Sequence, residues 1–463
     1  MTNKIPYPLL LAGALTLACI NSLHGAFQFD DYNVIVNNSL VHSWSAWLTD
    51  FPHGIRPFLK LTYTLNWTMG WGAFGFHLFN LAVHAGNTFL VYGIAARILR
   101  EQTAEASLPG ASMAAFLTAL LFAVHPVQTE AVTYISGRST SLMAFFYLAG
   151  FYAYQRGIEE NRRAFIYLAG PVLFGMAMLT KEVAITLPAA LLLWEACRQK
   201  RGEIAARLRH QGIYWVLLVI VLAAMLFHPR YGELLEFSAG TRSLRQNILS
   251  QINGICYLLS RFVWLQGQNI DPDLPVISHW TPLLACQAAL LIFMLAAGVA
   301  AVRKKPWLGF GMLWFFLHLL PTNSLIPRLD IANERQLYLS GFGLYLIAGQ
   351  GANLLYERTT QGKRFVCRGL GLLFLLLILA TIQRNHIYRN EIALWQDTAQ
   401  KSPHKARVYN NLGYALFLGG RYGEAREAYT VALRIKPDWA LARNNLAAVE
   451  AILHRETIIY GGY

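Results

Sequence analysis

The sequence predicts an all-α protein, a polytopic bundle of membrane helices followed by a small C-terminal helical domain. Hydrophobic residues make up 55% of the chain and charged residues only 14%, whereas soluble proteins average about 25% charged residues. Apolar segments of membrane-spanning length recur up to residue 384, and residues 406–439 follow a helical repeat pattern. We therefore expect a membrane domain over residues 1–384 and an extracytoplasmic domain over residues 385–463.

The apolar segments predict about eleven membrane spans, since a span needs roughly 17–25 mostly apolar residues. They are 6–24, 76–99, 111–128, 139–155, 164–180, 183–198, 213–228, 281–302, 307–321, 337–355 and 366–383. We interpret the first as a retained helix rather than a signal peptide, because Lys4 precedes it and no convincing cleavage site follows. If the apolar stretch 246–266 crossed the membrane, the basic clusters at 198–209 and 303–305 would lie on opposite sides of it. We therefore expect this stretch to lie at the outer interface or against the bundle.

Basic residues gather in alternate loops between these segments. The clusters are Arg97/Arg100, Arg156/Arg162/Arg163, Arg198/Lys200/Arg201/Arg207/Arg209, Arg303/Lys304/Lys305 and Arg358/Lys363/Arg364/Arg368. Because positive charge marks cytoplasmic loops, we expect a cytoplasmic N-terminus, an extracytoplasmic C-terminus and a location in the inner membrane. The same distribution accounts for the net charge of +14 without a nucleic-acid-binding face.

Residues 406–439 match the tetratricopeptide (TPR) pattern, which has a period of about 34 residues. The marker positions are Tyr409, Leu412, Gly413, Ala425, Tyr429, Ala432 and Pro437. Trp395, Thr398 and Pro403 are typical of the second helix of a preceding repeat, and Leu446 and Ala447 begin another helix. Since about three repeats are needed for a stable stack, we expect the array to lean on the bundle. It serves either as a structural cap or as a docking groove for a protein segment.

Ionisable residues crowd the loops that we place outside the membrane. Asp30 and Asp31 follow the first span among Phe27, Phe29 and Tyr32, where two carboxylates are costly unless something uses them. The others are Arg56, His125, Glu130, Arg138, Lys181, Glu182, Arg261, Arg328, Asp330, Glu334 and Arg335. Any one of them can simply pair within the bundle, as Glu130 can with Arg138, but the collection indicates function.

Carboxylates beside arginines suit the displacement of a phosphate leaving group by a hydroxyl. The carboxylate accepts the hydroxyl proton while guanidinium groups hold the phosphate oxygens. A single base without a paired nucleophile implies one in-line displacement, which inverts the anomeric carbon of a transferred sugar.

Five stretches together resemble the transmembrane and TPR-containing O-mannosyltransferases, membrane enzymes of the GT-C glycosyltransferase class. They are "FQFDDYNVIVNN", "RPFLKLTYTLNWTMGWGAFGFHLFNLAVHAGNTFLVY", "LFAVHPVQTEAVTYISGRSTSLMAFFYLAGFYAY", "LTKEVAITLPAALLLWE" and "IANERQLYLSGFG". The similarity runs from about residue 25 to 350 and the TPR follows in the family's order. The resemblance implies a GT-C-like bundle, a polyprenyl-phosphate sugar donor, a protein hydroxyl acceptor that the TPR can dock, and catalysis on the periplasmic face.

The resemblance also implies roles for individual residues. Its catalytic acidic pair falls on Asp30 and Asp31, and we expect Asp30 to be the base and Asp31 to orient it or to bind acceptor or metal, although the order can be reversed. Arg335 is expected to bind the donor phosphate. Further phosphate-binding candidates are Arg138 and Lys181, and candidates that shape the pocket are Arg56, His125, Glu130, Glu182 and Glu334.

Metal and sugar stay open at this point. Mg²⁺ or Mn²⁺ would suit Asp30 and Asp31 better than zinc, but the mannosyltransferase branch works without a metal, which we favour. The five cysteines show neither metal nor disulfide spacing. A TPR far shorter than in eukaryotic relatives indicates a bacterial version, whose sugar need not be mannose.

Three other functions compete with this hypothesis. A GT-C transferase can act on a glycolipid such as lipid A, or use a lipid-linked oligosaccharide. A transporter would carry its acids in the middle of spans, whereas here they gather at the outer ends. A non-catalytic membrane scaffold for the TPR gives no reason for the Asp30–Asp31 pair, Lys181 or Arg335.

Overall fold

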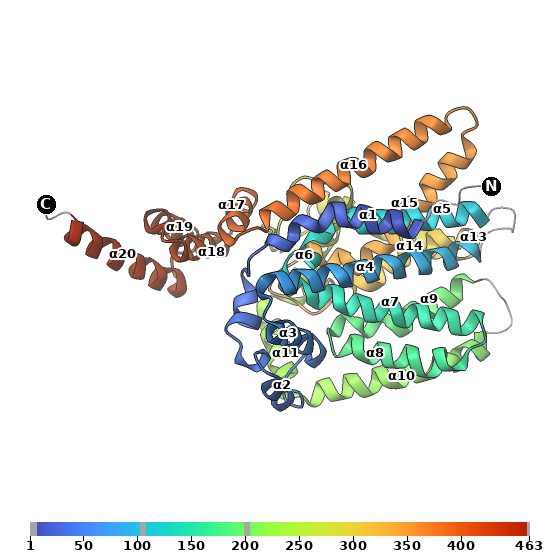
Figure 1. Ribbon diagram of the computed structural model, residues 1–463, viewed down its shortest axis with the longest axis horizontal. Helices are drawn as coiled ribbons and strands as arrows, with labels where there is room; N and C mark the ends of the chain where they lie inside the picture. Colours follow the sequence, from blue (N-terminus) through green and yellow to red (C-terminus); the bar gives the residue numbers. More distant parts are fainter. Residues whose placement is uncertain (1–6, 102–107, 199–203, 461–463) are drawn as a thin grey trace.

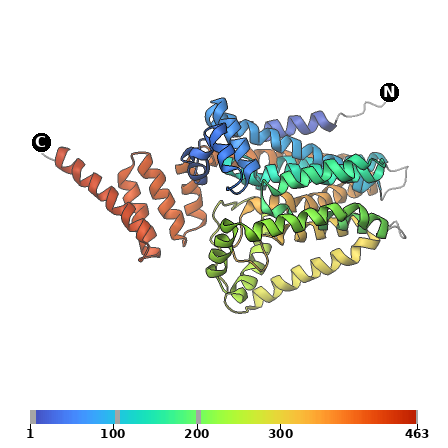
Figure 2. The ribbon, with the colours of Figure 1, turned by 90° about the horizontal axis from the view of Figure 1, so that it is seen from below.

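A computed structural model describes residues 7–101, 108–198 and 204–460 of the chain. Every regular element among these residues is a helix. Figure 1 shows long helices running side by side, with a smaller group of helices projecting from one end, and Figure 2 shows the same separation from below. The predicted all-α class is therefore confirmed.

The bundle contains eleven helices among the described residues, and each predicted apolar segment overlaps one of them. These are α1 (Tyr7–Cys19), α4 (Gly72–Arg100), α5 (Leu108–Val124), α7 (Arg138–Glu159), α8 (Gly170–Met178), α9 (Leu187–Cys197), α10 (Ile204–Phe227), α13 (Pro282–Lys304), α14 (Pro306–Leu319), α15 (Leu337–Arg358) and α16 (Lys363–Ile387). One continuous apolar core joins side chains from α1, α4, α5, α7, α9, α14 and α15.

The predicted count of about eleven spans is not confirmed. Five described helices are long and apolar enough to cross a membrane, or six if the bent pair Pro109–Val124 and Pro126–Val132 is one span. These are the helices of a multi-pass membrane protein. Helices such as α7 and α15 bury Gln155, Ser340 and Asn353 inside the bundle, and this hidden polarity lowers the hydropathy on which a count by composition depends.

Three of the five predicted basic clusters, those around Arg97, Arg156 and Arg198, lie together at the end of the bundle opposite the C-terminal helices. There α4, α7 and α9 end together (Figure 1). Arg97 Nε lies 3.1 Å from Glu159 Oε2, and Arg198 Nε lies 2.8 Å from Glu101 Oε1. Lys200 and Arg201 of the third cluster lie outside the described residues.

Short helices cap the other end of the bundle, beside the C-terminal domain. They are η1 (Ile20–His24), η2 (Tyr32–Val36), η3 (Ser39–Val41), α2 (Trp44–Asp50), α3 (Pro57–Met69), η5 (Pro126–Gln128), α6 (Thr129–Val132), η6 (Ile135–Gly137), η8 (Glu182–Thr186), α11 (Pro229–Thr241) and η9 (Glu334–Gln336). The stretch 246–266, which we expected to lie at the interface or against the bundle rather than to cross the membrane, forms α12 (Leu244–Val263). This helix packs against α13. Its buried side mixes Asn247, Gln251 and Leu258, and it is not among the helices apolar enough to span.

The C-terminal domain consists of α17 (Glu391–Lys401), α18 (Ala406–Leu418), α19 (Tyr422–Ile435) and α20 (Ala440–Tyr460). Helices α18 and α19 form the predicted TPR hairpin, and α17 and α20 are the flanking helices. Gly413 lies against the ring of Tyr429, where a Cβ atom would come within 2.7 Å of a ring carbon. This contact explains the small residue that the pattern requires at position 413. Helix α16 passes the predicted boundary at residue 384 and ends at Ile387.

Close backbone contact between α14 and α15 predicts a strong effect of one glycine. A Cβ atom on Gly343 would lie 2.1 Å from the carbonyl oxygen of Gly311, whereas a Cβ atom on Gly351, in the same helix, would meet nothing within 4 Å. We expect Gly343→Val to destabilise the bundle by roughly 3 kcal/mol through overpacking, and Gly351→Val to have little effect. Thermal unfolding in detergent measures both, and equal melting temperatures would contradict the packing described.

Candidate active site

The loop after η1, residues 25–31 (the first loop), turns sharply at Phe29. This residue has a φ of 49°, a left-handed conformation that costs a non-glycine residue about 1–2 kcal/mol. The Phe29 N–H donates to Glu391 Oε1 at 3.1 Å, and its ring packs edge-on against Trp395 at 5.0 Å. Helix α17 therefore holds the turn in place, and the turn sends the two following carboxylates in different directions.

Asp31 is buried and does not line the cavity described below. Its carboxylate accepts hydrogen bonds from the Gln28 N–H at 2.9 Å, from the Ser136 N–H at 2.8 Å and from the Ser136 hydroxyl. Burial raises the pKa of Asp31 to about 7, against the opposing effect of these donors. The residue thus joins the first loop to the segment around Ser136.

Asp30 is half-buried and faces a cavity of about 220 Å³. Its main-chain N–H donates to the Tyr134 hydroxyl at 3.0 Å. Its carboxylate accepts no hydrogen bond from the residues that the structure describes. Of the two adjacent acids, Asp30 is the one that is available to a molecule in the cavity.

The cavity is strongly basic. Its ionisable lining from described residues, apart from His318, comprises one acid and four bases: Asp30, Arg56, Lys181, Arg328 and Arg335. The neutral polar lining includes Tyr63, Ser136, Ser139, Thr140, Thr322, Asn333 and Gln336. Asp30 and Arg335, which lie about 300 residues apart in the chain, share one cavity, as the sequence hypothesis requires. A chamber with more cations than anions is suited to an anionic ligand.

Arg335 projects from η9, which Asn333 and Gln336 cap reciprocally. Glu130 holds it twice: Glu130 Oε2 accepts the Arg335 N–H at 2.9 Å, and Glu130 Oε1 lies 3.5 Å from Arg335 Nε. Burial alone would lower the pKa of Arg335, but the Glu130 charge raises it above its ordinary value. The guanidinium is therefore oriented from behind while it lines the cavity.

Lys181 and Arg56 lie on the side of the cavity formed by α3 and η8. Lys181 Nζ donates to Thr140 Oγ1 at 2.7 Å, and Arg56 forms a bidentate pair with Glu182 at 3.0 and 2.8 Å. Burial and the neighbouring arginines, Arg335 first, hold the pKa of Lys181 well below its ordinary value. Arg56 has a φ of 57° directly before Pro57, a second strained residue at the cavity wall.

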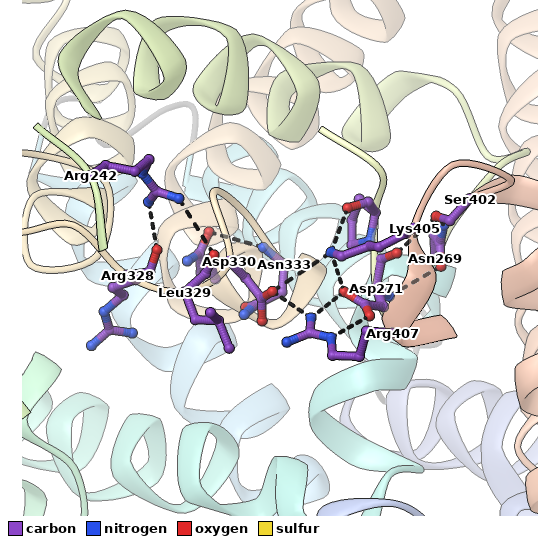
Figure 3. Close-up of polar contacts among 12 residues, drawn as sticks. Arg242, Asn269, Asp271, Arg328, Leu329, Asp330, Asn333, Ser402, Lys405 and Arg407 are labelled. Carbon is purple, nitrogen blue, oxygen red and sulfur yellow. Dashed lines mark hydrogen bonds and ion pairs between the residues drawn. The ribbon is translucent and has the colours of Figure 1, made fainter. Parts of the chain in front are cut away.

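Arg328 is the cavity residue to which sequence reasoning assigned no role. Among the described residues its guanidinium has no hydrogen-bond or ion-pair partner, although its carbonyl oxygen accepts from Arg242. Figure 3 shows the side chain pointing away from the polar network around it. Burial lowers its pKa. Its place seven residues before Arg335, in the same outer loop, was the available signal.

Arg138 is a correction to the sequence prediction. Its side chain is fully buried, and its guanidinium donates to Asn80 Oδ1 at 2.6 Å, to the Phe76 carbonyl at 2.9 Å and to Thr62 at 3.2 Å. It also lies over the ring of Phe79 at 4.4 Å. The residue does not line the cavity, and its donors are already used, so it is not a phosphate-binding residue in this structure.

Four further predicted pocket residues, His125, Glu130, Glu334 and Glu182, lie behind the cavity wall. His125 is buried, and its Nε2 lies 3.0 Å from the Phe262 carbonyl oxygen. Glu130 orients Arg335, as described above. Glu334 is buried and accepts the Asn269 N–H at 2.7 Å. Glu182 likewise acts on the cavity through Arg56, and it also accepts from the Tyr231 hydroxyl at 3.1 Å.

The acidic pair does not offer a shared metal site. Asp31 is committed to Ser136 and Gln28, so Asp30 alone reaches the cavity. Within the described parts of the chain, no group of three or more His, Cys, Asp or Glu side chains is placed to hold a metal ion. A divalent cation shared by the carboxylates of Asp30 and Asp31 does not fit this arrangement.

A second cavity, of about 490 Å³, adjoins the C-terminal end of α14. Its walls are almost entirely aliphatic and aromatic side chains of α9, α13 and α14, with Ile255 of α12 and Asn323 at one end. Thr322 lines the basic cavity and donates to Asn323 Oδ1 at 2.7 Å. Two adjacent residues, Thr322 and Asn323, therefore line the charged cavity and the apolar cavity respectively.

The Asp30–Asp31 geometry predicts different consequences for the two acids. Asp31→Ala leaves buried donors of Ser136 and Gln28 unpaired, and we expect a loss of roughly 2–4 kcal/mol of folding free energy. Asp30→Ala removes no hydrogen bond and should leave stability unchanged. Thermal unfolding of the two variants in the same detergent measures the difference. A melting temperature lowered more by Asp30→Ala would contradict the assignment.

The comparisons with known proteins agree with the sequence motifs. The family model described as tetratricopeptide repeat matches residues 406–439. The human protein O-mannosyl-transferase TMTC4 is 27% identical over 471 residues, which cover 87% of this chain and 63% of the relative. Human TMTC1 is 27% identical over 514 residues (95% and 56%), and Drosophila melanogaster Tmtc3 is 26% identical over 528 residues (94% and 56%). The predicted family resemblance is confirmed, and the chain spans 56–63% of the length of these relatives.

Proposed function

We propose that the chain is a membrane glycosyltransferase that moves a sugar from a polyprenyl-phosphate donor to a hydroxyl group of a protein. One observation carries the proposal: Asp30 shares a basic cavity with Arg335, Arg328 and Lys181. Extended similarity to proteins named protein O-mannosyl-transferases supports it, and makes mannose the first sugar to test. The C-terminal domain beside the cavity favours a protein acceptor over a lipid.

The reaction requires one displacement. Asp30 accepts the proton of the acceptor hydroxyl, whose oxygen attacks the anomeric carbon of the donor sugar. The bond between that carbon and the phosphate oxygen breaks as the new glycosidic bond forms. The electron pair leaves with the phosphate, where Arg335, Arg328 and Lys181 stabilise the developing charge. A direct displacement inverts the anomeric carbon.

The paired cavities suit both halves of such a donor. The basic chamber accommodates the sugar phosphate. The adjoining apolar cavity, lined by Leu193, Leu313 and Phe316 among others, provides a place for the first isoprene units of the lipid. Because adjacent residues, Thr322 and Asn323, line the two cavities, we place the phosphate near Thr322 with the sugar toward Asp30.

The proposed orientation places this site on the periplasmic face of the inner membrane. The basic ends of α4, α7 and α9 lie at the opposite end of the bundle (Figure 1), and basic ends favour the cytoplasmic side. A lipid donor in the outer leaflet can then reach the basic cavity, and a secreted protein can reach Asp30 and the C-terminal domain.

The central test is Asp30→Asn, which keeps the side-chain shape and removes the base. We expect sugar transfer to fall by about 10²–10⁴-fold while the amount of folded membrane protein is unchanged. Mass spectrometry of extracytoplasmic proteins, from cells with the wild-type gene, the variant or a deletion, measures the transfer. Asp438→Asn, on the exposed surface of the C-terminal domain, is the matched control.

Each outcome of that comparison is informative. Retained transfer in Asp30→Asn would remove this residue from the role of base. A gene-dependent sugar found on lipids and absent from proteins would replace the protein acceptor by a glycolipid. A protein glycan of several sugars that appears in one step would indicate a lipid-linked oligosaccharide donor.

Phosphate binding should depend on pH through Lys181. Its depressed pKa means that it loses its positive charge below the ordinary pH range of lysine, so affinity for a phosphate should fall as the pH rises. We expect about a tenfold loss of farnesyl phosphate affinity as the pH rises above the second phosphate pKa of about 6 toward the ordinary lysine pKa of about 10.4, while arginine stays protonated. Calorimetry or thermal shift in detergent measures this affinity, with farnesol as the uncharged control.

Two variants separate the lysine from the arginines. Lys181→Met should bind farnesyl phosphate weakly, and its affinity should not change with pH. Arg328→Gln should also bind farnesyl phosphate weakly, but its affinity should still fall as the pH rises. If Arg328→Gln binds farnesyl phosphate as tightly as the wild type, Arg328 is not part of the phosphate site. A pH profile unchanged in Lys181→Met would exclude the lysine.

A further inference from the structure

We infer that the C-terminal helical domain positions the candidate active site: Arg407 holds one catalytic loop and Glu391 holds the other. The inference rests on the proposed function for what the loops do, but the contacts stand by themselves. The first loop, residues 25–31, carries Asp30. We call residues 326–336, which carry Arg328 and Arg335, the arginine loop.

Arg407, in the first turn of α18, bridges two acids from different parts of the membrane domain. Its Nε donates to Asp271 Oδ2 at 2.9 Å, and its Nη2 contacts both Asp271 Oδ1 and Asp330 Oδ1. Figure 3 shows the guanidinium between the two carboxylates, with Lys405 reaching Asp271 from the same helix end. One side chain of the C-terminal domain therefore fixes Asp330, within the arginine loop.

Asp330 lies between Arg328 and Arg335, so fixing it limits where both cavity arginines can lie. From the other side, Arg242 donates to the carbonyl oxygens of Arg328 and Leu329. The arginine loop has no helix of its own before η9. Before η9 the loop is contacted by Arg242, which follows α11, by Asn323, which donates to the Ile331 carbonyl, and by Arg407 of the C-terminal domain.

A second set of hydrogen bonds involves residues 269–271. The Asn269 side chain donates to Ser402 Oγ at 2.7 Å, and the Ser402 hydroxyl donates to the Asp271 carbonyl at 2.8 Å. The Asn269 N–H donates to Glu334 Oε1 at 2.7 Å, one residue before Arg335. The end of α17 is thus linked to the residue next to the proposed phosphate ligand.

The start of α17 holds the first loop. Glu391 accepts the N–H of the strained Phe29, and the Ala26 N–H donates to the Arg389 carbonyl at 3.3 Å. Gln28 donates to the Tyr388 carbonyl. A left-handed Phe29 persists only if its surroundings enforce it, and here Glu391 and Trp395 do so from the C-terminal domain.

These contacts exceed what a cap on the bundle would need. The same short domain contacts the loop of the proposed base and the loop of the proposed phosphate ligands, at separate residues. It therefore sets the distance between base and leaving group, on which an in-line displacement depends steeply. Arg407 and Glu391 are positioning residues, since neither lines the cavity.

The experiment compares Arg407→Ala and Glu391→Ala with matched controls in the full-length protein. The controls are Arg421→Ala and Glu424→Ala, which break an exposed ion pair of 2.6 Å in the same domain. Hydrogen–deuterium exchange of the detergent-solubilised protein, without substrate, should show faster exchange over residues 326–336 in Arg407→Ala. Glu391→Ala should show faster exchange over residues 26–32. The two control variants should show unchanged exchange in both segments.

Function should divide in the same way. Arg407→Ala should weaken farnesyl phosphate binding by about tenfold or more, whereas Glu391→Ala should bind it normally and lower the rate of sugar transfer at saturating donor by about 10–10²-fold. General destabilisation of the domain would not produce this split. Unchanged exchange in both loops, or identical defects in both variants, would overturn the inference.

The two proposals fail separately. If the wild-type protein transfers no sugar, the proposed function fails, while the exchange measurements still decide whether the C-terminal domain holds the loops. If the exchange changes as expected but donor binding and transfer are both normal, the domain is a cap and the positioning role is wrong.

Discussion

The buried carboxylate of Asp31 is the contact on which the candidate site depends. This carboxylate accepts hydrogen bonds from the Gln28 amide and from the amide and hydroxyl of Ser136. It thereby fixes the first loop against η6, which directly precedes α7. Its neighbour must then point the other way, and the left-handed Phe29 makes this possible. Two acids that look equivalent in the sequence thereby divide between structure and chemistry: Asp31 is fully paired in the interior, and Asp30 is free in the cavity.

The same division applies to the basic residues. Arg138 is held by Asn80, Phe76 and Thr62 and belongs to the core, whereas Arg335 and Arg56 have one face on a carboxylate and the other on the cavity. A carboxylate behind a guanidinium fixes its direction without neutralising the chamber, because Arg328 and Lys181 add charge that no described acid matches with an ion pair. The strained backbone at Phe29 and at Arg56 borders the same space, as expected where strain is retained for function.

Sequence patterns predicted the helical class, the TPR hairpin, the basic ends and the shared cavity of Asp30 and Arg335. Each of these depends on a local pattern or on which end of a helix a residue occupies. The number of spans stays a prediction, because buried polar residues such as Gln155 and Asn353 lower the hydropathy by which helices are counted as spans. Sequence patterns could not separate Arg138 from Arg335. That separation depends on which arginine finds Asn80 or Glu130 behind it, a long-range packing outcome with no signal in spacing.

The described TPR hairpin and its two flanking helices rest directly on the membrane domain. Arg407, Ser402 and Glu391 make the contacts, Trp395 is buried, and the charges at the start of α18 pair with Asp271 and Asp330. In return, the arginine loop and the first loop, which have little regular structure, gain rigid partners. The C-terminal domain and the two loops therefore support one another through these hydrogen bonds and ion pairs. This mutual support is the physical basis for treating the C-terminal helices as part of the candidate site.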